Sequence, residues 1–387
     1  MTKMSNLPLE LLEEIFSRVP SKSMRAVRSI CKTWNKLSKD ESFTKKRLAQ
    51  EAITREREFL VVMVIDFRVY LMSVNVHGTQ NNVESHISPV KHKVQSHMII
   101  KQKGQLINLH DSDQVGISGI CHCAGLLLLT RDDYTSLVVW NPYTEQTRRI
   151  KPRSRDEWTF PVYAIGYETR KSCRHYKILR YKKYDEYEIY ELDSNSWRVL
   201  DVTSTIWETG FHLNGISVKG NAYWYVIPNK PLKKMNEFLI CFDFTKERFG
   251  QLLPMPFHSN DKYIVSLSSV REEQLAVLCQ RWDISRMEIW ITDKIEPNAV
   301  SWTKLFLEID MQPLADYDLD VKDGNFLIDE EKKVAVVFDN GKEMQPHNKA
   351  CIIGENGYFR KVDLGESAGQ LYWSPFVCSY IPSSVQI

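Results

Sequence analysis

Four apolar runs that each end in an aromatic residue recur along the chain at a nearly constant spacing. The aromatic residues are Trp140, Tyr190, Phe242 and Trp290, so the successive intervals are 50, 52 and 48 residues. Each run passes through a polar turn to a second short run that holds another apolar or aromatic residue. A β-hairpin unit that repeats every 40–50 residues or so is typical of a β-propeller, in which each repeat forms one blade.

Another short apolar or alternating run precedes each aromatic run. We expect these runs to be the inner strands of the blades, with the aromatic runs next outward; they are residues 125–129, 163–167, 221–225 and 275–278. Weaker units of the same kind flank the four, at residues 59–76 and 334–362. This pattern predicts about six blades, with seven as an alternative. An irregular β-sandwich or two smaller β domains are the other folds that such short strands allow.

A single strand is expected near the end of the chain, at residues 371–381. A propeller must close its ring to remove the open edge of its first blade. We therefore expect this strand to complete the first blade. No long helical pattern follows residue 58, which argues against a parallel α/β architecture.

Residues 5–50 follow a helical period instead. Leu11, Ile15 and Val19 recur at intervals of four, which predicts a helix that begins at Ser5 or Asn6 and ends at Pro20. A second helix is expected from Ser21 or Ser23 through residue 37, with an inward face of Met24, Val27, Ile30, Cys31, Trp34 and Leu37. A third is expected over residues 41–57, with Phe43, Leu48, Ala52 and Ile53 inward.

So short a helical segment buries too little apolar surface to be robust alone. Its apolar faces must therefore be covered by the following domain or by another protein. From the residues alone, a helical cap on the main domain is as good an interpretation as a partner-binding module.

The order and spacing of the N-terminal residues favour the second interpretation. Leu7-Pro8, Glu10-Leu11-Leu12, Glu14-Ile15-Phe16 and Val19-Pro20, followed by Arg28, Cys31-Lys32, Trp34 and Leu37, together resemble an F-box. This resemblance implies that the helices bind a Skp-type adaptor and, through it, a cullin scaffold. The implied adaptor contacts are Leu7, Pro8, Leu11, Leu12, Ile15 and Val19. Trp34 is expected in the core of the module itself.

The β region resembles the F-box-associated domain of flowering-plant proteins, which is related to kelch propellers. The segments that carry this resemblance are residues 121–128, 139–144, 164–167 and 214–224. We therefore expect a mainly β protein with an N-terminal α module: a three-helix F-box at 1–50, a helical linker at 51–58 and a β-propeller at 59–387.

The two resemblances together imply a function. The chain is expected to be a non-catalytic, substrate-recognition subunit of a Skp–cullin–F-box ubiquitin ligase, with a protein substrate on the propeller. The alternative is a carbohydrate-binding, lectin-like propeller adaptor, in which loop aromatics stack on sugar rings. A propeller hydrolase is a third and weaker hypothesis.

Composition narrows the remaining possibilities. Lys plus Arg is 51 and Asp plus Glu is 49, so the net charge of +2 gives no sign of a nucleic-acid-binding chain. No apolar run approaches the ~20 residues that cross a bilayer, and the first twenty residues lack the apolar core of a signal peptide. The eight cysteines show no disulfide pattern. We expect a reduced compartment, the cytoplasm or the nucleus.

Few residues are of a type and spacing that indicate catalysis or metal binding. Cys121, His122 and Cys123 lie on one expected strand, where neighbours point to opposite faces, and no second ligand pair follows. We therefore expect no metal and no cofactor. The acid pairs at 132–133 and 330–331 are interpreted as solvated turns. Substrate recognition is expected in connecting segments, at 75–103, 151–159, 229–236 and 310–323.

Overall fold

The fold is described from a computed structural model of the chain. The structure describes residues 8–19, 24–38, 40, 42–44, 46–48, 58–65, 68–75, 99–105, 116–131, 133–153, 161–171, 173–182, 186–202, 215–227, 237–257, 263–281, 286–305, 309–310, 326–339, 347–354, 359–366 and 376–387.

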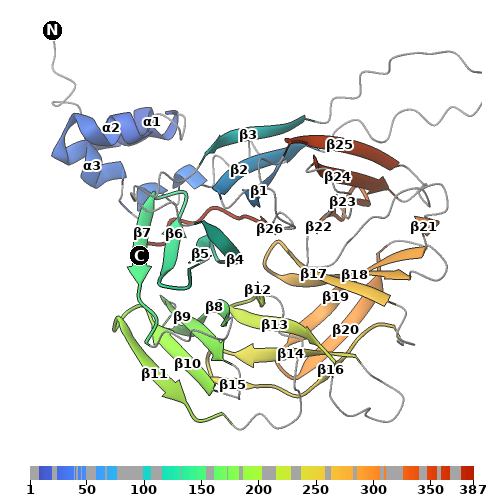
Figure 1. The fold of residues 1–387 in the computed structure, drawn as a ribbon. Helices are drawn as coiled ribbons and strands as arrows, with labels where there is room; N and C mark the ends of the chain where they lie inside the picture. Colours follow the sequence, from blue (N-terminus) through green and yellow to red (C-terminus); the bar gives the residue numbers. More distant parts are fainter. Residues whose placement is uncertain are drawn as a thin grey trace, which may run out of the picture.

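Six antiparallel sheets, counted over these residues, are arranged around a common axis as the blades of a propeller (Figure 1). From the axis outward, blade 1 is β26 (Phe376–Ser379), β1 (Glu58–Ile65), β2 (Arg68–Asn75) and β3 (Ile99–Gln105). Blade 2 is β4 (Ile117–Cys123), β5 (Leu126–Arg131), β6 (Leu137–Asn141) and β7 (Gln146–Ile150). Blade 3 is β8 (Val162–Arg170), β9 (Cys173–Lys182), β10 (Glu186–Glu191) and β11 (Ser196–Leu200).

The remaining blades follow the same order. Blade 4 is β12 (Ile216–Val218), β13 (Asn221–Val226), β14 (Phe238–Asp243) and β15 (Arg248–Phe249), and β16 (Leu253–Pro254) also pairs with β14. Blade 5 is β17 (Tyr263–Val270), β18 (Gln274–Arg281), β19 (Arg286–Glu296) and β20 (Ala299–Lys304), and β21 (Ile309–Asp310) also pairs with β19. Blade 6 is β22 (Phe326–Asp329), β23 (Val334–Asp339), β24 (His347–Gly354) and β25 (Phe359–Glu366).

The last strand of the chain closes the ring, as the sequence predicts. β26 pairs antiparallel with β1, so that Val377 lies opposite Met63. Val377 and Met63 belong to one apolar cluster, which also takes in residues of β23 and β24 from blade 6. The first blade is therefore built from both ends of the propeller sequence, and the prediction of a six-bladed mainly β fold is confirmed.

The order of strands within the blades corrects one prediction. The innermost strands are β4, β8, β12, β17, β22 and β26, which contact one another around the axis. Of the four runs predicted to be innermost, only residues 163–167 are, in β8. Residues 125–129, 221–225 and 275–278 lie in or around β5, β13 and β18, which are second strands, and the aromatic runs form third strands throughout.

Small polar side chains explain why the sequence pattern did not identify most of the innermost strands. A strand next to the axis has one edge without a neighbouring strand, and its buried carbonyls still need donors. Side chains of the innermost strands donate to these carbonyls from other blades. Cys121 Sγ donates to the Tyr163 carbonyl at 3.5 Å, and Ser217 Oγ donates to the Ile165 carbonyl. Ser268 Oγ donates to the Phe326 carbonyl at 2.7 Å, and Ser379 Oγ donates to the Ser269 carbonyl at 3.3 Å. The serines at these positions are polar, so these strands lack the continuous apolar run by which a buried strand is recognised.

Tight hairpins gather at one end of the propeller, which we call the hairpin end. In blades 2 to 5 they join the first strand to the second and the third to the fourth, and in blade 6 they join the first to the second. Apart from Tyr134, every described residue with positive φ lies in one of these turns. At Gly125, where φ is +84°, a Cβ would approach the Cβ of Ser383 to 2.1 Å, so this turn requires glycine.

The N-terminal helical module (residues 8–48) consists of α1 (Leu9–Ser17), α2 (Met24–Ile30) and α3 (Lys32–Ser38), with further helical residues at 42–44 and 46–48. Its core is Leu12, Phe16, Trp34, Leu37 and Phe43. The Phe16 and Trp34 rings meet edge to face with centroids 4.9 Å apart, so Trp34 anchors the core as predicted. No helix among the described residues is long and apolar enough to span a membrane.

Three details of this module differ from the predictions. α1 begins after Pro8, which stands at the N-cap position without a side-chain cap, while Ser5 and Asn6 lie outside the described residues. The second predicted helix is divided at Cys31 into α2 and α3. Ile30, which was predicted to face inward, is the last residue of α2 and is 60% exposed. The third predicted helix extends over residues 49–57, which also lie outside the described residues.

Candidate functional site

An exposed apolar row runs along α1. Leu11 is 47% exposed and Ile15 is 38% exposed, and their spacing of four residues places them one above the other on a single helix face. Pro8, at the start of the helix, is exposed as well. Neither Leu11 nor Ile15 belongs to any apolar cluster of the propeller or of the module. The propeller therefore leaves this row uncovered.

The other predicted contact residues lie elsewhere. Leu12 is only 4% exposed and packs with Phe16 in the core of the module, because each residue of a helix lies about 100° around the axis from the one before it. In this structure Leu12 stabilises the helices among themselves, and its predicted contact with an adaptor stays a prediction. Val19 is half-buried against the same core, and Leu7 lies outside the described residues.

Ile30 adds to the exposed apolar surface and was missed in the sequence. The large apolar residues exposed in the described part of the chain are Leu11, Ile15, Ile30, Val199, Ile227 and Ile381. Half of them lie in the small helical module. No proline or glycine marks the end of α2 at Ile30, so the sequence offered no signal for it. Burying each such side chain in a partner is worth roughly 1.5–3 kcal/mol.

The charged residues beside this row are solvated. Arg18 pairs with Glu14 at 2.6 Å, with side chains 78% and 59% exposed, and Lys46 pairs with Glu13 at 3.1 Å. Exposed pairs of this kind contribute about 0–1 kcal/mol to stability. They keep the surface around the apolar row polar without covering it.

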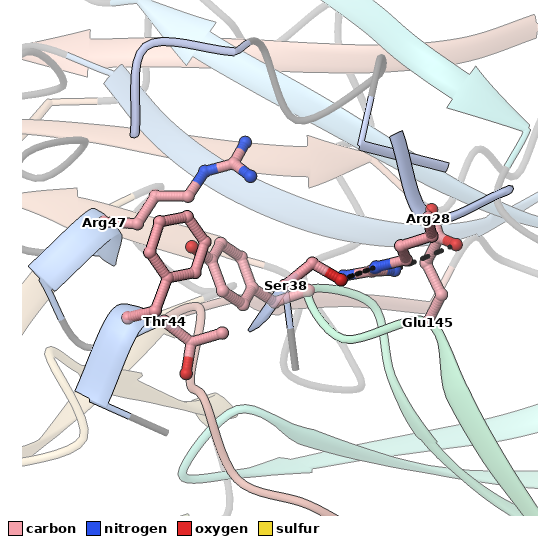
Figure 2. Close-up of a pocket in the computed structure, with 7 residues that line it drawn as sticks. Arg28, Ser38, Thr44, Arg47 and Glu145 are labelled. Carbon is pink, nitrogen blue, oxygen red and sulfur yellow. Dashed lines mark hydrogen bonds and ion pairs between the residues drawn. The ribbon is translucent and has the colours of Figure 1, made fainter. Parts of the chain in front are cut away.

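The helical module is joined to the propeller through the turn between β6 and β7 (Figure 2). Arg28 of α2 forms an ion pair with Glu145 at 3.3 Å and donates from Nη1 to the Thr144 carbonyl at 3.3 Å. The hollow at this junction has a volume of about 20 Å³, which is room for about one water molecule and not for an organic ligand. Its lining residues are Arg28, Ser38, Phe43, Thr44, Arg47, Tyr143 and Glu145.

The Cys121-His122-Cys123 segment has a structural role at the hairpin end. The Gly125 N–H donates to Nε2 of His122 at 3.1 Å, so the imidazole proton lies on Nδ1, which faces Oε1 of Glu272 at 3.1 Å. Glu272, in the turn between β17 and β18, also accepts from the Ala124 N–H at 2.5 Å. Blades 2 and 5 are thus tied together near the axis. Burial raises the pKa of the Cys121 and Cys123 thiols.

Burial also lowers the pKa of His122 from its ordinary value of 6.5, although Glu272 acts in the opposite direction. Between the two pKa values the unfolded chain binds a proton that folded His122 does not, so stability rises with pH there. We expect the free energy of unfolding to decline as pH falls below about 6.5. Urea unfolding at pH about 7.5 and at pH about 5.5 measures this decline in the free energy of unfolding. The decline between the two pH values should be smaller in His122→Gln than in the native chain. Equal declines in both proteins would show that His122 is not the linked group.

The remaining predicted features have ordinary partners or lie outside the described residues. Glu331 pairs with Arg271 at 3.2 Å, and both side chains are largely exposed. Asp133 pairs with Arg131 at 3.3 Å and caps the Thr135 N–H, whereas Asp132 lies outside the described residues. Most of the predicted recognition segments also lie outside them: residues 76–98, 154–159, 229–236 and 311–323.

Comparison with known proteins agrees with the two-part organisation. Residues 4–46 match the F-box domain, and residues 60–387 match the F-box associated beta propeller domain. F-box/kelch-repeat protein At3g16740 of Arabidopsis thaliana is 48% identical over 413 residues, and F-box protein At3g17320 of the same plant is 46% identical over 431 residues. In both cases the match covers 100% of this chain and 100% of the relative.

Another Arabidopsis relative is 54% identical over 396 residues, covering 100% of this chain and 98% of its own. Among solved structures, a chain of a nidogen/laminin complex superposes with a TM-score of 0.41 at 10% identity, covering 84% of this chain and 99% of that chain. The two domain matches and the full-length relatives together place the sequence. The chain belongs to the plant F-box proteins that carry an F-box-associated β-propeller.

Proposed function

We propose that this chain is a non-catalytic adaptor of a Skp–cullin–F-box ubiquitin ligase, with its F-box on a Skp-type adaptor and a protein substrate on its propeller. The observation that carries the proposal is the uncovered row of Leu11 and Ile15 within an F-box. Apolar side chains held at fixed spacing on a helix are suited to insertion into an apolar groove of another protein. Ile30 is a candidate third contact from α2.

In this function the chain contributes position and no chemistry. A substrate lysine held close to a ubiquitin-charged conjugating enzyme experiences a raised effective concentration, which linkage alone supplies. The propeller provides a rigid scaffold for recognition, and the F-box provides attachment to the ligase. Ubiquitin transfer itself takes place on the other subunits.

The proposal is tested by the affinity of the full chain for a Skp-type adaptor. We expect Leu11→Asp with Ile15→Asp to weaken binding about 100-fold or more, because two apolar contacts are lost and two charges face the groove. Isothermal titration or a pull-down with purified adaptor measures the effect.

Val199→Asp with Ile227→Asp is the matched control. These residues are 59% and 51% exposed but lie on the propeller, so the control should bind the adaptor like the native chain. Native-like binding by the Leu11 and Ile15 variant, or no binding by the native chain, would falsify the proposed function.

A further inference from the structure

The β6–β7 turn of blade 2 lies between the F-box and the segment of residues 381–387. On the F-box side, Arg28 is only 15% exposed and makes three contacts. Besides the ion pair to Glu145 and the bond to the Thr144 carbonyl, its Nε donates to Oγ of Ser38 on α3 at 3.3 Å. One guanidinium therefore links α2, α3 and the turn. We call Arg28, Ser38, Thr144 and Glu145 the joint; Figure 2 shows Arg28, Ser38 and Glu145.

The turn that receives Arg28 is itself firmly held. Asn141, at the end of β6, is fully buried, and its Oδ1 accepts from the N–H groups of Tyr143 at 2.9 Å and Thr144 at 3.3 Å. Its Nδ2 donates to the carbonyls of Ser383 at 2.9 Å and Val385 at 2.7 Å. All the hydrogen-bonding capacity of one amide is thereby used to fix the turn against residues 383–385.

A second residue of the same hairpin repeats this connection. Gln146, the first residue of β7, accepts at Oε1 from the Ile387 N–H at 3.1 Å and donates from Nε2 to Oε1 of Gln386 at 2.6 Å. The turn is thus held to residues 381–387 on both of its strands.

Residues 381–387 are anchored to the ring in their turn. Val385 and Ile387 pack against the apolar cluster shared by blades 2 and 3. Just before the segment, Tyr380 is buried and its N–H donates to the Leu60 carbonyl of β1 at 2.8 Å. The strand that closes the ring therefore continues directly into the segment that supports the turn.

We propose that the joint fixes the orientation of the F-box relative to the propeller, with Arg28 as the positioning residue. A guanidinium bonded to a carboxylate, a carbonyl and a hydroxyl on three elements defines a direction as well as a distance. The consequence for ubiquitin transfer rests on the proposed function, because a substrate on the propeller is presented at an angle that the joint sets. The orientation itself does not depend on that function.

The test measures the distance between labels on the two domains in the full-length chain. Labelled non-natural amino acids at Lys36 of α3 and Val199 of β11, both exposed, leave the eight native cysteines untouched. For the native chain we expect a single narrow distance distribution. In Arg28→Glu the ion pair becomes a repulsion, and the population of other orientations should rise about tenfold. Glu145→Arg should have the same effect.

The double variant with Arg28→Glu and Glu145→Arg restores the attraction and should narrow the distribution again. Arg18→Glu is the matched control, because Arg18 lies in the same module and, among the described residues, its ion pair is with Glu14 of α1, at 2.6 Å. It should leave the distribution unchanged. An unchanged distribution in Arg28→Glu would overturn the proposal. So would a double variant that stays as broad as the single ones, since a merely destabilised F-box would not be rescued by the exchange.

Adaptor affinity separates this proposal from the proposed function. Arg28 faces the propeller and not the row of Leu11 and Ile15, so Arg28→Glu should bind a Skp-type adaptor as tightly as the native chain. The native chain could bind no adaptor while the distance between the labels still changes in Arg28→Glu and is restored in the double variant. That result would support the positioning role of the joint and contradict the proposed ligase function.

Discussion

Removal of residues 376–387 is expected to prevent the propeller from folding altogether, and not merely to weaken it. The deletion takes away β26, the innermost strand of blade 1, and exposes the edge of β1 from Val61 to Val64. Val377 and Tyr380 leave two different apolar clusters, one shared with blade 6 and one shared with blade 2. The ring then loses its closure on both sides of the first blade, and an open edge next to buried valines favours aggregation.

Soluble yield and cooperative thermal unfolding, followed by circular dichroism, check this expectation. Ser379→Ala is the mild control, since it removes one hydroxyl but leaves the pairing of β26 with β1 in place. A separate peptide of residues 376–387 should restore solubility in part by adding the missing strand. A deleted chain that unfolds cooperatively at the native temperature would contradict the closure argument.

Glu188→Ala is expected to cost about 3–5 kcal/mol of stability, because it leaves the charge of Arg180 buried without its carboxylate. The two residues are direct cross-strand partners on β9 and β10, with Nη1 and Oε2 2.9 Å apart. Their side chains are 2% and 6% exposed, so water replaces little of the lost interaction. Replacing both residues, Arg180→Met with Glu188→Leu, should cost less than Glu188→Ala alone, because the buried guanidinium is removed together with this carboxylate.

Urea unfolding of the single and double variants measures these differences. Glu14→Ala, which breaks the exposed Arg18–Glu14 pair, is the comparison and should cost no more than about 1 kcal/mol. If Glu188→Ala cost no more than Glu14→Ala, or if the double replacement cost more than either single one, the desolvation argument would be wrong.

The ring of blades could be predicted because its signal is repeated. The aromatic residues at 140, 190, 242 and 290 all lie on third strands, so their spacing measures one full blade each time. The innermost strands could not be predicted in the same way. Their side chains face buried backbone of other innermost strands, and the serines that satisfy those carbonyls are polar where a buried strand is expected to be apolar.

The candidate site was predictable in part. The F-box motif identified α1 and its apolar residues, but motif positions do not distinguish the inward Leu12 from the outward Leu11. The predicted second helix is divided at Cys31 without a proline or glycine in the sequence to mark the division, and the exposure of Ile30 was not predicted. The contact between Arg28 and Glu145 could not be predicted from the sequence, because the two residues are far apart in it and no motif distinguishes Arg28 from the other arginines.

The side-chain bonds between innermost strands bear on how this family diversifies. Each bond ends on a backbone carbonyl, a group that every residue possesses, so it places no demand on the identity of the residue that supplies it. The centre of the propeller can therefore keep its geometry while the outer strands and the segments between blades change in sequence.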